Sequence, residues 1–200
     1  MRLIFFSQIV FLSCFLFSSV SSARCRFQFD DTSAGVTWTG YKFSEKVGVS
    51  GTFDVVTFSQ NSKSASVASL VKSVHFRVDS ASINSGMPAR DKKLALYLFG
   101  SMLDPGAITG KVKSYRPKLK VATASILMNG VSQDVAFAVA DNGNQLLFTG
   151  EIDLLSFKMK KGFERIAKAC QELHTGPDGK AKTWSVVGLK VVAPYAKTCQ

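Results

Sequence analysis

The segment SINSGMPARDKKLALYLF at residues 82–99 carries helix signals in a chain whose other patterns are mostly those of strands. Pro88 suits a first helical turn, because the N–H that proline lacks would have no partner there. The charge of Asp91 is favoured near a helix N-terminus. Three apolar residues lie three and four positions apart and so share one helical face: Leu94, Tyr97 and Leu98. We predict one short helix near residues 88–99.

Outside this segment, apolar and polar residues alternate in the way that is typical of half-buried strands. Eight stretches show strand patterns: residues 35–41, 47–58, 71–78, 107–113, 119–128, 131–140, 146–155 and 184–193. Most are joined by short turns such as Asn129-Gly130, so neighbouring strands should run antiparallel. The pattern predicts an all-β fold, either an up-and-down barrel or a sandwich. In a barrel, the helix would either cover one open mouth or seal a packed core.

Residues 1–23 have the features of an export signal. Arg2 precedes an apolar run at residues 3–20, and residues 21–23 are small, as a signal peptidase requires. We therefore expect a cleaved signal peptide, a single domain at residues 24–200, and a periplasmic or secreted location. The apolar run approaches the length that spans a bilayer, so an uncleaved anchor is the alternative.

Three cysteines follow the export signal: Cys25, Cys170 and Cys199. Disulfides persist in the compartments that exported proteins reach. If the sheet closes on itself, its first strand runs antiparallel to its last, so the start of one meets the end of the other. This arrangement favours a Cys25–Cys199 bond, and a Cys170–Cys199 bond is the alternative.

The chain is strongly basic, with 25 Lys and Arg against 14 Asp and Glu and a formal net charge of +11. The positive residues gather at 111–120 and 158–168. These segments lack the interleaved aromatic residues of a nucleic-acid platform, so we expect no nucleic-acid partner. A solvated basic face is the simplest interpretation, and attraction to an anionic membrane is the second. A homodimer is a further expectation if a barrel mouth exposes apolar surface.

No sequence motif indicates catalysis or a metal site. The GVSG at residues 48–51 lacks the spacing of a nucleophile elbow. His174 lies four residues after Cys170, but no second close pair accompanies it, so a structural zinc site is not expected. No glycine-rich loop suits a phosphate or a dinucleotide. We expect a non-catalytic protein with no resident cofactor and no metal.

Several segments together resemble the YceI-like family of exported lipid-binding proteins. They are residues 36–38, 49–53, 82–86, 124–131 and 152–157, with Arg90-Asp91 and Leu94. The resemblance spans nearly the whole chain after the export signal. It implies an eight-stranded lipocalin-like barrel with a long apolar cavity and ligands of isoprenoid or fatty-acyl type. Residues 41–43 depart from the family, which often has a histidine there, and this departure bears on ligand identity rather than fold.

The residues expected to face inward are rich in aromatic side chains. That pattern alone favours a packed core, whereas the resemblance favours a cavity. The candidate ligand-binding residues are Trp38, Phe53, Phe76, Met87, Arg90, Leu94, Leu98, Phe137, Phe148 and Phe157. Candidate polar anchors at the mouth are Lys42, Arg90 and Asp91, although a local helix-start interaction would also explain Arg90 and Asp91.

From the resemblance and these candidate residues, we expect the protein to bind, store or transport an apolar chain-bearing lipid. Its partner would then be a lipophilic small molecule. A bound lipid or isoprenoid would then occupy the cavity in place of a cofactor. The alternative is a secreted interaction module with a solid core, which would bind an anionic membrane or an acidic partner through its basic surface.

Overall fold

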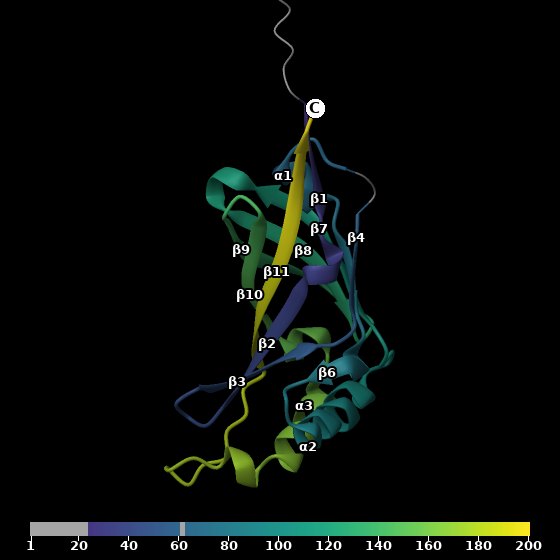
Figure 1. The fold of residues 1–200 in the computed structure, drawn as a ribbon. Helices are drawn as coiled ribbons and strands as arrows, with labels where there is room; N and C mark the ends of the chain where they lie inside the picture. Colours follow the sequence, from purple (N-terminus) through teal and green to yellow (C-terminus); the bar gives the residue numbers. More distant parts are fainter. Residues whose placement is uncertain (1–23, 61–62) are drawn as a thin grey trace, which may run out of the picture.

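The computed structural model describes residues 24–60 and 63–200, so the predicted export signal lies outside the described residues (Figure 1). The strands are β1 (Cys25–Phe29), β2 (Gly35–Lys42), β3 (Val47–Phe53), β4 (Val56–Ser59), β5 (His75–Val78), β6 (Ile83–Asn84), β7 (Ile108–Arg116), β8 (Val121–Met128), β9 (Val131–Asp141), β10 (Gln145–Asp153) and β11 (Val186–Cys199). They form one sheet in the order β4-β5-β7-β8-β9-β10-β11-β2-β3-β6, with β1 paired to β11. The pairings between these strands are antiparallel.

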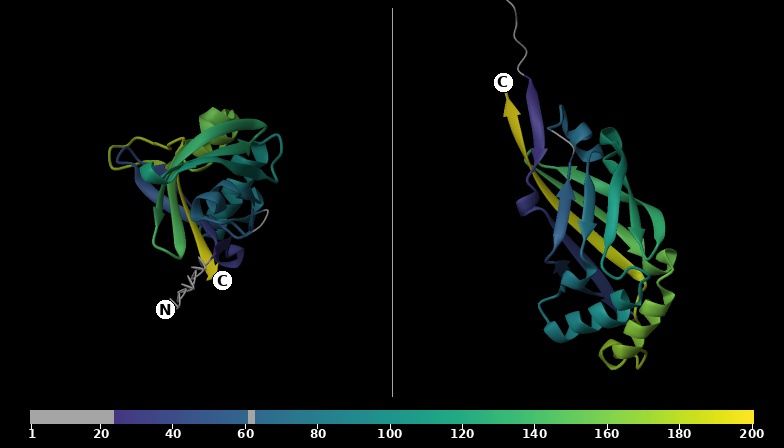
Figure 2. Two further views of the ribbon diagram at one scale, coloured as in Figure 1. Left: turned by 90° about the horizontal axis from the view of Figure 1, so that it is seen from above. Right: turned by 90° about the vertical axis from the view of Figure 1, so that its right-hand side faces the viewer.

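The two ends of this strand order meet because two long strands bend together. β4 continues β3 after residues 54–55, and β6 continues β5 after residues 79–82. β3 pairs with β6 and β4 pairs with β5, so the two bent strands are paired on both sides of the corner. Counting each bent pair as one strand and leaving β1 aside, the 11 strands reduce to the predicted eight. The predicted antiparallel barrel is therefore confirmed, and Figure 2 shows the sheet curled around its interior.

Within the described residues three α-helices accompany the sheet: α1 (Val67–Lys72), α2 (Pro88–Lys93) and α3 (Lys160–Ala169). α2 continues as a π-helical turn, η3 (Leu94–Leu98), and a 3-10 turn, η4 (Phe99–Ser101). The helix predicted near residues 88–99 is therefore present. The other short turns are η1 (Asp31–Ser33), η2 (Ser80–Ser82), η5 (Pro117–Leu119), η6 (Leu154–Phe157) and η7 (Glu172–His174). No helix in residues 24–60 or 63–200 has both the length and the apolar character needed to cross a bilayer.

Two of the helices are not among the sequence predictions. α1 begins between the strands predicted at residues 47–58 and 71–78, and it includes Val71, the first residue of the second predicted strand. A reciprocal capping box between Ser66 and Ser69 starts this helix. α3 contains Gly162, which is unfavourable in a helix interior. A Cβ at Gly162 would stand 2.5 Å from the Leu98 carbonyl oxygen, so the glycine allows α3 to pack directly against η3.

The last strand is longer than predicted. The predicted strand ended at residue 193, just before Pro194, but β11 continues to Cys199. The Pro194 carbonyl accepts a hydrogen bond from the Asp30 N–H at 2.9 Å, at the gap between the β2 and β1 pairings. Residues 195–199 pair with β1, a short strand that the sequence did not predict. Pro194 lies between the two pairings, where the strand needs no N–H donor.

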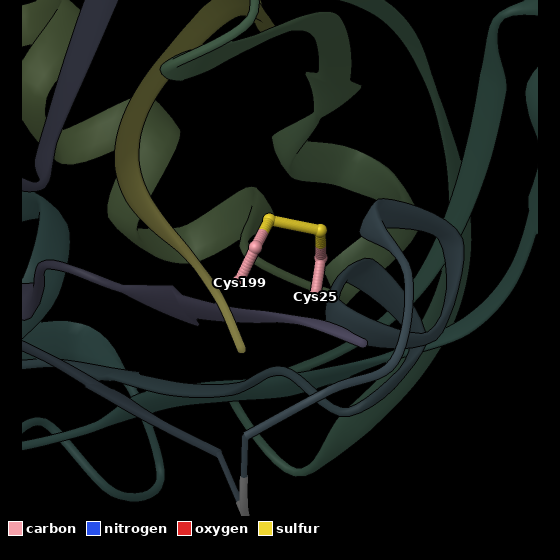
Figure 3. The surroundings of a disulfide bond; sticks show 2 residues. All are labelled: Cys25 and Cys199. Atoms are coloured by element: carbon pink, nitrogen blue, oxygen red, sulfur yellow. A yellow bond between two sulfur atoms is a disulfide. The ribbon is translucent and has the colours of Figure 1, made fainter. Parts of the chain in front are cut away.

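The two ends of the barrel are built differently. At one end, α1 and β1 lie near the C-terminus, and at the other α2, η3 and α3 lie together (Figures 1 and 2). We call these the closed end and the helical end. At the closed end Cys25 and Cys199 face each other across β1 and β11 and form a disulfide (Figure 3). Cys170 follows α3 at the helical end and is a buried free cysteine. The structure thus has the Cys25–Cys199 pairing and not the alternative.

Candidate functional site

A cavity of about 480 Å³ runs through the barrel interior. Along β8 and much of β11 every second residue faces it, as the pleat of a strand requires. From β8 and β11, for example, the lining residues are Ala122, Ala124, Ile126, Met128, Val187, Leu189, Val191 and Ala193. The barrel interior therefore encloses open apolar space and is not solidly packed.

Aromatic rings form much of the wall, and glycines on neighbouring strands make room for two of them. Trp38 pairs across the sheet with Gly51, and Phe76 pairs with Gly110. A Cβ on Gly51 would stand 2.5 Å from a ring carbon of Trp38, and one on Gly110 would overlap the ring of Phe76. The missing side chains therefore let both rings lie close to the neighbouring strand.

Nine of the ten candidate ligand-binding residues line this cavity: Trp38, Phe53, Phe76, Met87, Arg90, Leu94, Leu98, Phe137 and Phe148. Phe157 does not line it. That side chain is 1% exposed and lies in the core beyond the wall, where its carbonyl accepts a hydrogen bond from the Asn129 amide at 2.9 Å. The ligand-binding role of the nine remains a prediction.

The helical end supplies lining residues that sequence reasoning missed. From α3 and the turn after it come Phe163, Ile166, Cys170 and Leu173. The apolar face of α3 was detectable, because residues 163, 166 and 170 follow helical spacing. Its many lysines led instead to the interpretation of a basic segment. Met87 is 56% exposed and Leu173 is 65% exposed although both line the cavity, so the cavity reaches the surface at this end.

The three candidate polar anchors differ in their contacts. The Arg90 guanidinium donates to the Ser85 hydroxyl at 2.7 Å and to the Ser85 carbonyl at 2.9 Å, and Asp91 accepts from the Ser85 N–H at 2.9 Å. The local helix-start interaction therefore accounts for both residues. Lys42 lines the cavity, and its ammonium lies 4.5 Å from the centre of the Phe43 ring.

Two further polar residues of the lining meet near Lys42. The Lys93 ammonium donates to the Ala169 carbonyl at 2.9 Å, which joins the end of α2 to the end of α3. His174 Nδ1 lies 2.7 Å from the Thr183 hydroxyl. Burial lowers the pKa of His174, and the positive charges of Lys42 and Lys93 lower it further. The polar end of the cavity is thus an electropositive region.

The described part of the chain offers no cluster of three His, Cys, Asp or Glu side chains that could hold a metal ion. No aspartate or glutamate of the described residues lines the cavity, so its polar end lacks the paired carboxylates of general acid–base sites. The geometry instead fits the retention of an apolar molecule, with polar groups gathered at one end.

A model of the YceI-like domain matches residues 27–174, which covers most of the barrel and both helices of the helical end. The chain belongs to the YceI-like family. Among curated proteins, none matches it in sequence.

Two solved structures share the fold of this YceI-like chain. One is a polyisoprenoid-binding domain from Saccharophagus degradans, with a TM-score of 0.57 and 14% identity over 88% of this chain and 100% of that chain. The other is BcnA from Burkholderia cenocepacia, with a TM-score of 0.59 and 18% identity over 84% of this chain and 99% of that chain. These similarities establish the fold of the YceI-like barrel.

Proposed function

We propose that this YceI-like protein binds one apolar chain-bearing lipid, of isoprenoid or fatty-acyl type, in the barrel cavity and stores or carries it without catalysis. The observation that carries this proposal is the cavity of about 480 Å³ with its almost wholly apolar wall. Its volume falls within the range of about 300–1,000 Å³ that is common for small-molecule sites. The polyisoprenoid-binding domain with the same fold supports the choice of ligand class.

The energetics of such a complex are favourable. Each CH₂ group removed from water contributes about 0.8 kcal/mol. Part of this gain is offset by the lost freedom of the ligand, yet several buried carbons suffice for stable binding. The wall needs few polar contacts, and a polar group at one end is enough to orient the chain.

Extraction and native mass spectrometry test the proposal. Protein from its exported location should release a chain-bearing apolar compound in near-equimolar amount and should show the matching bound mass. Ala124→Phe places a ring in the cavity and should abolish the bound mass, because Ala124 faces inward. Ala138→Phe is the matched control on the exposed face of β9 and should keep it. Empty protein, or equal loading of both variants, would refute the proposal.

We further propose that the helical end contacts an anionic bilayer while the lipid passes in or out. Three large apolar side chains are exposed there: Met87, Leu96 and Leu173. Lys92 of α2 and Lys168 of α3 are exposed at the same end, and each such charge adds about 1 kcal/mol near an anionic surface. Met87→Ser with Leu173→Ser should reduce binding to anionic vesicles. Unchanged vesicle binding would contradict this contact.

The location and the oligomeric state belong to the same proposal. We propose cleavage after residue 23 and a periplasmic or secreted location, which the Cys25–Cys199 disulfide supports because such bonds persist outside the cytosol. N-terminal sequencing of the mature protein would test the cleavage. A homodimer remains a prediction, and the mass of the intact assembly measures it directly.

A further inference from the structure

The charged residues of the cavity wall have one sign and one location. Those with a basic side chain are Lys42, Arg90, Lys93 and His174, all from the helical end. No aspartate or glutamate of the described chain contributes to the wall. The rest of the cavity, as far as Phe29 and Ala193 near the closed end, is apolar. The wall therefore has a polarity that runs from one end to the other.

Three of these basic residues come together from separate elements. Lys42 ends the inward-facing series of β2, in which Val36, Trp38 and Gly40 precede it. Lys93 ends α2, and its ammonium is held near the end of α3 by the Ala169 carbonyl. His174 bonds to Thr183, whose backbone bridges to Lys42. Arg90 is different, because Ser85 already occupies its guanidinium.

No carboxylate among the described residues forms an ion pair with Lys42 or Lys93. The ion pairs found in the described chain join Lys113 to Asp134 and Lys160 to Glu164, away from the cavity. Asp178 lies in the neighbouring loop, but it accepts from the Ser44 hydroxyl and the Lys180 N–H and does not line the wall. Two half-buried ammonium groups therefore face an apolar space with only neutral protein partners. An anion placed there would be attracted strongly, since the local dielectric constant is low.

We propose that Lys42, Lys93 and His174 form the site for an anionic headgroup, a carboxylate or a phosphate, of an amphiphile whose chain fills the cavity. This inference rests on the proposed function and specifies the class of ligand. The charge fixes the direction of the chain, with its head at the helical end and its tail toward the closed end. It also selects between lipids that have equal chains and different heads.

A pair of ligands that differ only in the head tests the site. Displacement of a fluorescent fatty acid analogue is measured with palmitate and with the alcohol of the same chain length, without membranes. Palmitate should bind at least about tenfold more tightly, as a charge-assisted contact predicts. Equal affinities would overturn the headgroup site and leave the proposed function standing. Binding of neither compound would refute both the headgroup site and a ligand of fatty-acyl type.

Variants locate the selectivity. Lys42→Gln with Lys93→Gln should bring palmitate and the alcohol to equal affinity. Lys111→Gln with Lys190→Gln removes the same charge from the exposed strand faces and should keep the preference. A preference that survives in the first double variant would overturn the assignment. The comparison of ligands in the unmodified protein stands by itself if that variant does not fold.

Inorganic phosphate distinguishes a headgroup from a free anion. At millimolar concentration it should not displace the fluorescent fatty acid, because it lacks the chain that supplies most of the affinity. Displacement of the fluorescent fatty acid by millimolar phosphate would assign the lysines to a site for a free anion and would overturn the proposal.

Discussion

The closed end and the helical end of this barrel both consist of short helices packed against strands, but they differ in side-chain burial and in helix capping. At the closed end, Leu70 and Val71 of α1 and Leu146 of β10 are 0% exposed. α1 has a complete capping box, whereas α2 begins at Met87 without any side-chain cap and continues into a π-helical turn. Such turns are frequent at functional sites. The comparison shows that the closed end has the tighter packing, whereas the helical end provides the opening to the cavity.

The largest expected effect compares one substitution at the two ends. Leu70→Ala should lower the free energy of unfolding by about 4 kcal/mol, because the side chain is fully buried and leaves a cavity. Leu94→Ala should cost only about 1 kcal/mol, since this half-buried residue already borders open space. Urea unfolding of both variants measures the difference. Equal losses would show that the ends do not differ in packing.

The disulfide offers the next test of the comparison. Cys25→Ser with Cys199→Ser opens a bond between residues 174 apart in sequence and should cost about 3 kcal/mol. Ligand affinity of the folded variant should stay unchanged, because the bond is at the end away from the opening. Denaturant unfolding and ligand titration on the same sample give both values. A large loss of affinity would mean that the ends are coupled.

A smaller effect is expected at Tyr195, also at the closed end. Burial first and then the hydrogen bond to Asp141 raise the pKa of Tyr195 to about 12. The protonated tyrosine is therefore favoured in the folded state, and its contribution to stability is lost as the pH rises from about 10 through 12. Tyr195→Phe should cost about 1 kcal/mol at pH 8 and should show less alkaline sensitivity. Unfolding at pH 8 and pH 11 measures both.

The smallest effect concerns His174 at the helical end. Its pKa is lowered by burial and by Lys42 and Lys93, so the neutral ring is favoured in the folded state. Its contribution is present above the ordinary pKa of 6.5 and is lost as the pH falls below that value. His174→Gln should therefore show a weaker decline of stability between pH 7 and pH 5. Identical pH profiles would indicate that the ring does not sense its lysine neighbours.

Local patterns in the sequence predict much of this fold. The alternation of side chains locates the strands, and Pro88 with the apolar spacing after it predicts the helix. The bend between β3 and β4 was contained in the single predicted strand at 47–58, because apolar residues continue through the corner. The strand predicted at 71–78 ended with β5, and β6 beyond the second corner was not predicted. Helices and strands that contain a residue unfavourable to them were harder to predict. Gly162 lies inside α3, and Pro194 lies inside β11.

The cavity itself depends on contacts between distant residues. Aromatic residues at strand spacing favour a packed core when only the sequence is known, and it is the register that places Gly51 beside Trp38 and leaves room for the ring against the neighbouring strand. The small residues Ala122, Ala124 and Ala193 create space that a list of large side chains does not show. The approach of Lys93 and His174 to Lys42 likewise requires the tertiary fold, since three separate elements carry them.

The pairing of β1 with β11 has a practical consequence. The Arg24 N–H donates to the Gln200 carbonyl at 2.8 Å, and the Gln200 N–H donates back to Arg24 at 3.1 Å. A tether attached at Gln200 therefore immobilises the molecule by its closed end on a sensor chip or electrode. The loading aperture then points into the flow, so every attached copy presents the same orientation to whatever is passed over it.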